Sequence, residues 1–220
     1  MRQPHPRRAP GRVPVRYALR HLQAVGGAAL TTQDPTQDRI EPESEPERRT
    51  RSRTRAWAVF GLIAVAVIAI DVAVKQWTTS TIVHGEPVKL LGGLIYVIHT
   101  RNSGAAFSML PNQTWIFPLI AFGVIAWLFW MIKGTVSAAW AVALGLVLGG
   151  AAGNLGDRLF RAPGPFRGHV VDMFSFLDDH AGHFPVFNIA DSALTVGVIL
   201  AILLEFTGRL RDGTRARRDA

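Results

Sequence analysis

Two aspartates, Asp172 and Asp191, lie where the chain returns to strongly apolar sequence. Two acids at one site can share a proton, so that one is ionised to activate water and the other is protonated to act as an acid. Such a pair predicts hydrolysis without a metal or a covalent nucleophile. Other interpretations stay open, because Asp191 follows Asn188 as a helix-capping acid would. Asp172 also suits a surface loop, and acids in apolar surroundings occur in ion pathways.

A second pair of charged residues, Asp71 and Lys75, lies inside the first long apolar segment. The spacing of four residues, with the acid first, favours an ion pair on a helix. Counted from Trp57 at 1.5 Å per residue, Asp71 is about 21 Å along that helix, in the outer third of a membrane. Pairing reduces a cost of roughly 2.5–3.5 kcal/mol for a lone charge at mid-membrane. A structural ion pair and a direct role toward substrate are equally compatible with this spacing.

A third polar group, Asn154, Asp157 and Arg158, ends the third apolar segment. Spacings of three and four residues put the amide on the same helix face as both charged side chains. The competing interpretation is an anchor at the membrane interface, which is the simpler one for Arg158 alone. Small residues recur every four positions before this group and predict close helix packing: Gly145, Gly149 and Gly153.

A metal site is the first competing hypothesis, because three histidines and three acids lie in or beside one connection. The sequence has no His-Glu-x-x-His helix, so we predict neither a metal nor a cofactor. The residues of this candidate cluster are His169, His180, His183, Asp172, Asp178 and Asp179.

A serine peptidase site is the second competing hypothesis. Ser103 or Ser192 would need a positioned base, and His99 lies four residues before Ser103 in an expected strand, where such residues are far apart. Ser103 is more simply a turn residue before Gly104. A small ion carrier also displays intramembrane charges, but carriers usually hold them at mid-membrane and often contain internal repeats, and the sequence shows neither.

The elements that must position these residues are four apolar segments. Of the 220 residues, 49% are hydrophobic and 18% are charged, a balance that is unusual for a soluble protein. Each segment is close to the length that crosses a ~30 Å hydrocarbon core, whereas a soluble core would leave too little sequence to cover these segments. The chain has no cysteine, which excludes disulfides and a cysteine nucleophile. The segments are Trp57–Trp77, Trp115–Ile132, Ala138–Leu155 and Ile189–Phe206.

Basic residues lie next to the expected spans on a single side. The positive-inside rule makes this side cytoplasmic, with both termini, and puts the connections 78–114 and 156–188 outside. Residues 90–99 are rich in β-branched and aromatic residues and predict a small β-patch in the first outer connection. The basic residues are Arg48, Arg49, Arg51, Arg53 and Arg55 before the first span, Lys133 between the second and third, and Arg209, Arg211, Arg215, Arg217 and Arg218 after the fourth.

The organisation we predict is a basic, disordered extension over 1–55, a four-span membrane domain over 56–207, and a basic tail over 208–220. The extension is rich in arginine and proline, which disfavours a packed core, although Tyr17–Leu30 suits a transient surface helix. It lacks interleaved aromatics and directly precedes a membrane segment. We therefore expect it to bind anionic lipid and no nucleic acid.

Five short motifs occur in one order and spacing over residues 57–206. Together they resemble the lipoprotein signal peptidase family, also called signal peptidase II. The motifs are Asp71-Val-Ala-Val-Lys75, Asn102-Ser-Gly-Ala-Ala-Phe107, Gly149-Gly-Ala-Ala-Gly-Asn154-Leu-Gly-Asp157-Arg158, Val170-Val-Asp172-Met-Phe174 and Phe187-Asn188-Ile-Ala-Asp191.

The resemblance implies an all-α protein of the bacterial inner membrane, with four transmembrane helices, a small extracytoplasmic β-patch and short outer connections. It implies an aspartic endopeptidase that removes signal peptides from diacylglyceryl-modified prolipoproteins, on the N-terminal side of the lipidated cysteine. One chain holds the whole expected site, so a monomer suffices. The catalytic pair would be Asp172 and Asp191, near the outer face, and the residues that support the pair or bind substrate would be Asp71, Lys75, Asn102, Gly104, Asn154, Asp157, Arg158 and Asn188.

Overall fold

The computed structural model describes residues 44–104, 114–179, 182 and 184–216. Most of the basic extension, with its expected helix at Tyr17–Leu30, lies outside these residues. The end of the second motif, Ala105–Phe107, lies outside them as well, together with His180 and His183.

The first helix, α1 (Glu45–Thr81), is longer than the predicted span. At 1.5 Å per residue its 37 residues extend about 55 Å. It begins earlier than expected because Ser44 caps its N-terminus, where the Ser44 backbone N–H donates to the Glu47 carboxylate at 3.0 Å. A proline in the first turn also suits a helix start. Residues 45–55, which we expected to be disordered, are therefore helical, and the domain boundary predicted at 55/56 falls inside α1.

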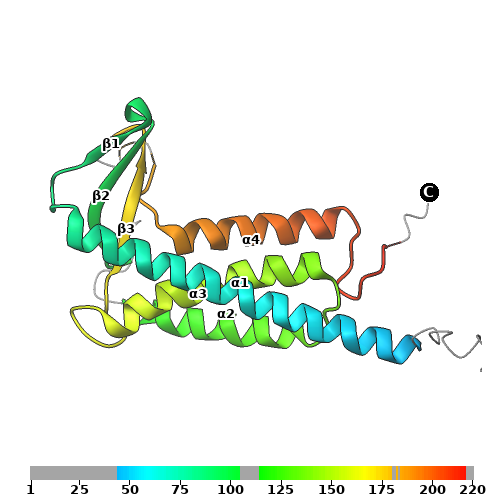
Figure 1. Ribbon diagram of the computed structural model, residues 1–220. Helices are drawn as coiled ribbons and strands as arrows, with labels where there is room; N and C mark the ends of the chain where they lie inside the picture. The colour runs from blue at the N-terminus through cyan, green and yellow to red at the C-terminus, as the bar shows by residue number, and fades with distance from the viewer. Residues whose placement is uncertain (1–43, 105–113, 180–181, 183, 217–220) are drawn as a thin grey trace, which may run out of the picture. The chain divides into compact units, whose positions relative to one another are not determined.

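Three further helices complete the bundle, and α3 lies at its centre. The third helix, α3 (Ala138–Phe160), packs against α1, α2 (Ile116–Ile132) and α4 (Ile189–Phe206) (Figure 1). Among the described residues, α1, α3 and α4 are long and apolar enough to cross a membrane, whereas α2 has 17 residues and is shorter. The main apolar core lies between these helices and includes Phe60, Leu128, Ile132, Trp140 and Leu144.

Glycines allow the close approach of α3 to its neighbours, as the four-residue spacing predicted. A Cβ at Gly145 would lie 2.8 Å from the Phe60 carbonyl oxygen, and one at Gly149 would lie 2.6 Å from the Val67 side chain. The glycine stripe therefore faces α1, where any larger side chain would push the helices apart.

A three-stranded antiparallel sheet lies beside the C-terminal end of α1 (Figure 1). Strands β1 (Val88–Leu90) and β2 (Ile95–Asn102) flank a short 3₁₀ turn and match the predicted β-patch. The third strand, β3 (Val170–Phe176), pairs with β2 and was not predicted as a strand. A small core of Ile82, Val97, Val171 and Met173 attaches the sheet to the helices.

The opposite end of the bundle holds the turn between α2 and α3 and the segment after α4. The Arg53 guanidinium on α1 donates to the Lys133 carbonyl at 2.6 Å. The Val136 N–H donates to the Arg211 carbonyl at 2.9 Å, and the Trp140 indole donates to the Arg209 carbonyl at 2.6 Å. The basic segments that the sequence placed on one side thus lie together at one end, away from the sheet.

Candidate active site

Asp172 lies on β3 and is held by two side-chain amides. The register pairs Asp172 with Thr100 on β2, so Asn102, two residues further on, is on the same face of the sheet. The Asn102 amide donates to Asp172 Oδ2 at 3.0 Å, and the Asn188 amide donates to Asp172 Oδ1 at 2.7 Å. Only 2% of Asp172 is exposed, and this burial raises its pKa to about 6.

Asp191 lies in the first turn of α4, whose N-cap is Asn188. The Asp191 N–H donates to Asn188 Oδ1 at 2.8 Å, and the Asn188 N–H donates to Asp191 Oδ2 at 3.2 Å. This reciprocal capping fixes the carboxylate relative to the helix. The same Asn188 reaches Asp172 because Phe187 pairs with Phe174 on β3 and brings the chain back beside that strand. One asparagine therefore contacts both acids.

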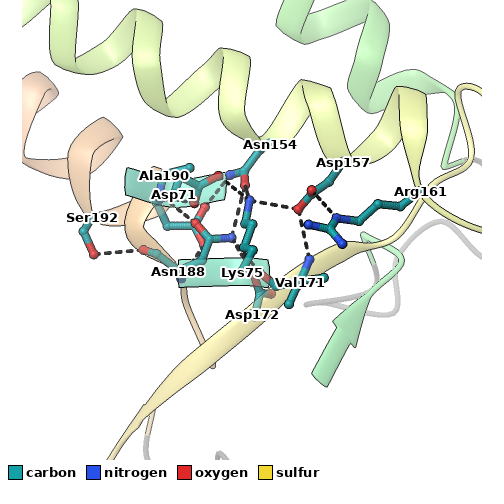
Figure 2. Close-up of polar contacts among 11 residues, drawn as sticks. Asp71, Lys75, Asn154, Asp157, Arg161, Val171, Asp172, Asn188, Ala190 and Ser192 are labelled. Carbon is teal, nitrogen blue, oxygen red and sulfur yellow. Dashed lines mark hydrogen bonds and ion pairs between the residues drawn. The ribbon is translucent and has the colours of Figure 1, made fainter. Parts of the chain in front are cut away.

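Asn154 on α3 forms a second link between the same groups (Figure 2). Its amide donates to Asp191 Oδ1 at 2.7 Å. Its carbonyl oxygen accepts from the Asn188 amide at 3.1 Å and from Lys75 Nζ at 3.2 Å. Because the carbonyl oxygen already faces two donors, the amide nitrogen is directed toward the carboxylate.

Gly104 directs the Asn102 side chain in a similar way. Its N–H donates to Asn102 Oδ1 at 2.7 Å, which leaves the amide nitrogen for Asp172. Gly104 has φ of +98°, and a Cβ there would lie 2.3 Å from a ring carbon of Phe117. Only glycine fits this backbone conformation and this space.

Lys75 is fully buried and lies among three oxygen atoms. Its ammonium pairs with Asp71 Oδ2 at 2.7 Å and with Asp157 Oδ2 at 2.8 Å, besides the contact to Asn154. The predicted pair between Asp71 and Lys75 is therefore present, and α3 adds a second acid to it (Figure 2). Arg161, one turn after Asp157, pairs with the other oxygen of that carboxylate at 2.5 Å.

Arg158 is 9% exposed, and its guanidinium lies over the Phe117 ring, 4.6 Å from the centroid. Its Nη1 atom has no hydrogen-bond partner among the described residues. The carboxylates of Asp157, Asp172 and Asp191 all act electrostatically on this guanidinium. A buried cation with a free donor near three carboxylates is therefore available to bind an oxygen of a ligand.

The structure brings nine of the ten predicted site residues into one network of contacts, and Arg158, the tenth, interacts electrostatically with three of its acids. The partners of the histidine and the serine do not support the serine peptidase hypothesis. His99 packs edge-on against His84 with centroids 5.7 Å apart, and Ser192 donates to the Asn188 carbonyl at 2.9 Å. The described part of the chain contains no cluster of three or more potential metal ligands, and His180 and His183 of the candidate metal cluster lie outside it.

Sequence reasoning missed four contributors to this network. Phe117 and Arg161 contact predicted site residues, and two backbone amides, those of Val171 and Ala190, donate to site carboxylates. Arg161 lies four residues after Asp157, so its helical spacing was an available signal. The amides of Val171 and Ala190 belong to the backbone, which is the same for almost every residue type, so no sequence signal marked them.

The long apolar helices are those of a membrane protein. The two carboxylates, both hydrogen-bonded to Asn188, form a site suited to acid–base chemistry. Comparison with known proteins identifies its relatives. The signal peptidase II family model matches residues 63–207. A lipoprotein signal peptidase of Mycobacterium avium is 46% identical over 158 residues, which are 72% of this chain and 84% of that protein. One of Mycobacterium tuberculosis is 47% identical over 146 residues, 66% of this chain and 70% of that protein.

Solved structures show the same relationship. A bacterial membrane enzyme determined by the in meso method at 2.3 Å resolution is 29% identical and superposes with a TM-score of 0.59, covering 71% of this chain and 93% of that chain. A second, at 1.9 Å resolution, is 32% identical with a TM-score of 0.57, covering 66% and 90%. The chain belongs to the signal peptidase II family.

Proposed function

We propose that Asp172 and Asp191 are the catalytic pair of this enzyme, a membrane peptidase that cleaves the signal peptides of prolipoproteins. The observation that carries the assignment is the double role of Asn188, whose side chain donates to Asp172 and whose backbone donates to Asp191. The charge of Asp191 also acts on the Asp172 carboxyl, which is the coupling that allows two acids to share one proton. Apart from this pair, the acids of the network, Asp71 and Asp157, are both engaged by Lys75.

In the proposed reaction, Asp191 is ionised and removes a proton from a bound water molecule. The water oxygen attacks the carbonyl carbon that precedes the lipidated cysteine of the prolipoprotein. Asp172 then protonates the departing amine as the C–N bond breaks. The deeper burial of Asp172, with its pKa raised to about 6, supports its assignment as the group that holds the proton at rest.

Arg158 is the proposed donor to the oxyanion that forms on the attacked carbonyl. Its free Nη1 atom and its contact with Phe117 support this role, because a fixed donor in a buried site stabilises developing charge without having to reorganise. Asn102 and Asn154 each donate to one carboxylate and keep it oriented toward the water.

The membrane topology that we propose has four spans, with α2 as the shortest. Its 17 residues reach about 25 Å at 1.5 Å per residue, at the lower limit for a span. The end with Arg53, Lys133 and Arg211 faces the cytoplasm, as positive charge favours, and both termini lie there. The sheet and the catalytic pair then lie near the extracytoplasmic face, where a lipid-anchored substrate arrives sideways through the bilayer. One chain supplies every residue of this site, so the proposed active form is a monomer.

The test is cleavage of a purified diacylglyceryl-modified prolipoprotein by the full chain in lipid or detergent. We expect Asp172→Asn and Asp191→Asn each to lower the rate by at least about 10²-fold, as for loss of a positioned acid or base. Asp212→Asn, which removes an exposed acid at the opposite end of the bundle, serves as the matched control and keeps the wild-type rate. Normal cleavage by either variant of the pair would remove that residue from the mechanism.

A further inference from the structure

Lys75 and its partners Asp71, Asp157 and Asn154 form a buried group that we call the Lys75 cluster. Its two carboxylates each accept a hydrogen bond from a backbone amide next to a proposed catalytic residue. Asp71 Oδ1 accepts from the Ala190 N–H at 3.0 Å, and Ala190 immediately precedes Asp191. Asp157 Oδ2 accepts from the Val171 N–H at 3.1 Å, and Val171 immediately precedes Asp172. The two contacts are equivalent, although one reaches from α1 to α4 and the other from α3 to β3 (Figure 2).

Lys75 joins the two carboxylates that make these contacts. Its ammonium lies 2.7 Å from Asp71 Oδ2 and 2.8 Å from Asp157 Oδ2. An ammonium has three donors, and Asn154 Oδ1 accepts the third at 3.2 Å. Because every donor has a partner inside the protein, Lys75 keeps no donor for a substrate. Its side chain is also fully buried.

We propose that Lys75 is a positioning residue that sets the separation of Asp172 and Asp191 by holding Asp71 and Asp157, each of which fixes the backbone before one of them. The proposal rests on the assignment of the catalytic pair made above. A continuous path of five polar contacts runs from the Ala190 amide through Lys75 to the Val171 amide and to Asn154. Removal of the Lys75 ammonium therefore displaces both catalytic carboxylates.

A close approach of α3 confines the Asp71 carboxylate. A Cβ at Gly153 would lie 2.8 Å from Asp71 Oδ2, so this glycine provides the space through which the Asp71 carboxylate reaches α4. Water has no access to Lys75 or Asp71, which are both 0% exposed.

A residue that serves stability alone would change the melting temperature and leave the chemistry of the folded enzyme intact. A residue that sets the separation of two coupled acids changes kcat, and it changes the interval between the two apparent pKa values of the kcat profile, because that interval reflects their mutual interaction. The titratable groups that surround the pair are Lys75 and Asp71 from α1 and Asp157 and Arg158 from α3.

The experiment measures kcat, KM and the pH profile of kcat for Lys75→Met, Asp71→Asn and Asp157→Asn with the diacylglyceryl-modified prolipoprotein. The asparagine variants keep the shape of the side chain but remove the negative charge that holds the Lys75 ammonium. An N–H donor also replaces one acceptor oxygen, so that at least one donor partner of each side chain loses its acceptor. We expect kcat to fall about tenfold to a hundredfold, as for a small misplacement of reacting groups. KM stays near the wild-type value, and the two limbs of the pH profile move closer together.

Lys133→Met is the matched control, because Lys133 is an exposed lysine at the end of the bundle opposite the site. It should keep the wild-type kcat and pH profile. The double variant Asp71→Asn with Asp157→Asn should lose less than the product of the two single losses, because both acids act through one ammonium.

The outcomes decide the proposal separately from the catalytic assignment. Folded variants with the wild-type kcat and pH interval would overturn the positioning role while Asp172→Asn and Asp191→Asn remain inactive. If Lys75→Met does not fold, the two asparagine variants give the answer. Equal activity of Asp172→Asn and wild type would instead overturn the assignment of the pair, whatever the Lys75 variants do.

Discussion

Gly153→Ala tests whether the close approach of α3 to Asp71 is as tight as the structure requires. The added Cβ would lie 2.8 Å from Asp71 Oδ2 and 3.2 Å from the Ala190 Cβ, inside the ~3.5–4.0 Å that non-bonded heavy atoms prefer. Overpacking costs about 1–3 kcal/mol, and loss of the bond between Asp71 and the Ala190 N–H about 1.5–3 kcal/mol. The helix propensity of alanine returns about 1 kcal/mol. The net destabilisation is then about 1.5–5 kcal/mol.

The assay is thermal unfolding of the purified chain, with Gly156→Ala as the matched control on the same helix. A Cβ at Gly156 meets nothing within 4 Å, so that variant gains up to about 1 kcal/mol from helix propensity. At about 2–4 °C per kcal/mol, the two variants should differ by about 3 °C or more, and kcat should fall only for Gly153→Ala. Equal melting temperatures and equal kcat values would refute the packing argument.

Three further predictions follow from single contacts. Because Asp172 loses its proton as the pH rises past about 6, kcat/KM should decline there. Asn102→Ala should move this alkaline limb to higher pH, since it removes a donor that stabilises the ionised form. Gly104→Ala should lower the melting temperature and the cleavage rate, because its φ of +98° disfavours a side chain and an added Cβ would overlap the Phe117 ring of α2. Trp140→Phe should lose about 1 kcal/mol of stability and keep the wild-type kcat in cleavage assays, because its indole bonds only the Arg209 carbonyl, at the end opposite the site.

The helices were predictable because their apolar runs and polar boundaries are local properties. The fourth segment, Ile189–Phe206, matches the predicted bounds, and the third begins at the predicted Ala138. The start of α1 was missed because arginine composition outweighed the cap formed by Ser44 and Glu47, although that pattern is visible in the sequence. The site residues were predicted as a group from their types and from the family resemblance, since most of them are charged or amide residues in or beside apolar segments.

The contacts that organise the site were less predictable, because they join distant parts of the chain. β3 was not predicted as a strand, and a surface loop was one interpretation of Asp172. The β-branched and aromatic residues of β3 suit a strand, but its partner β2 lies about 70 positions earlier in the chain. The bond from the Ala190 N–H to Asp71 spans 119 residues and uses an amide that every amino acid except proline carries. Only the folded arrangement shows such a contact.

The spacing of Asp71 and Lys75 also has a consequence for synthesis. α1 emerges first, and Asp157 and the Ala190 N–H follow about 80 and 120 residues later. A lone charge in the bilayer costs roughly 2.5–3.5 kcal/mol, but an acid and a base one turn apart can pair as soon as α1 is helical. During synthesis Asp71 can therefore neutralise Lys75 within α1 before the other helices are present. When α3 and α4 pack against α1, Asp157 also binds Lys75 and the Ala190 N–H binds Asp71, so that the pair then connects three helices.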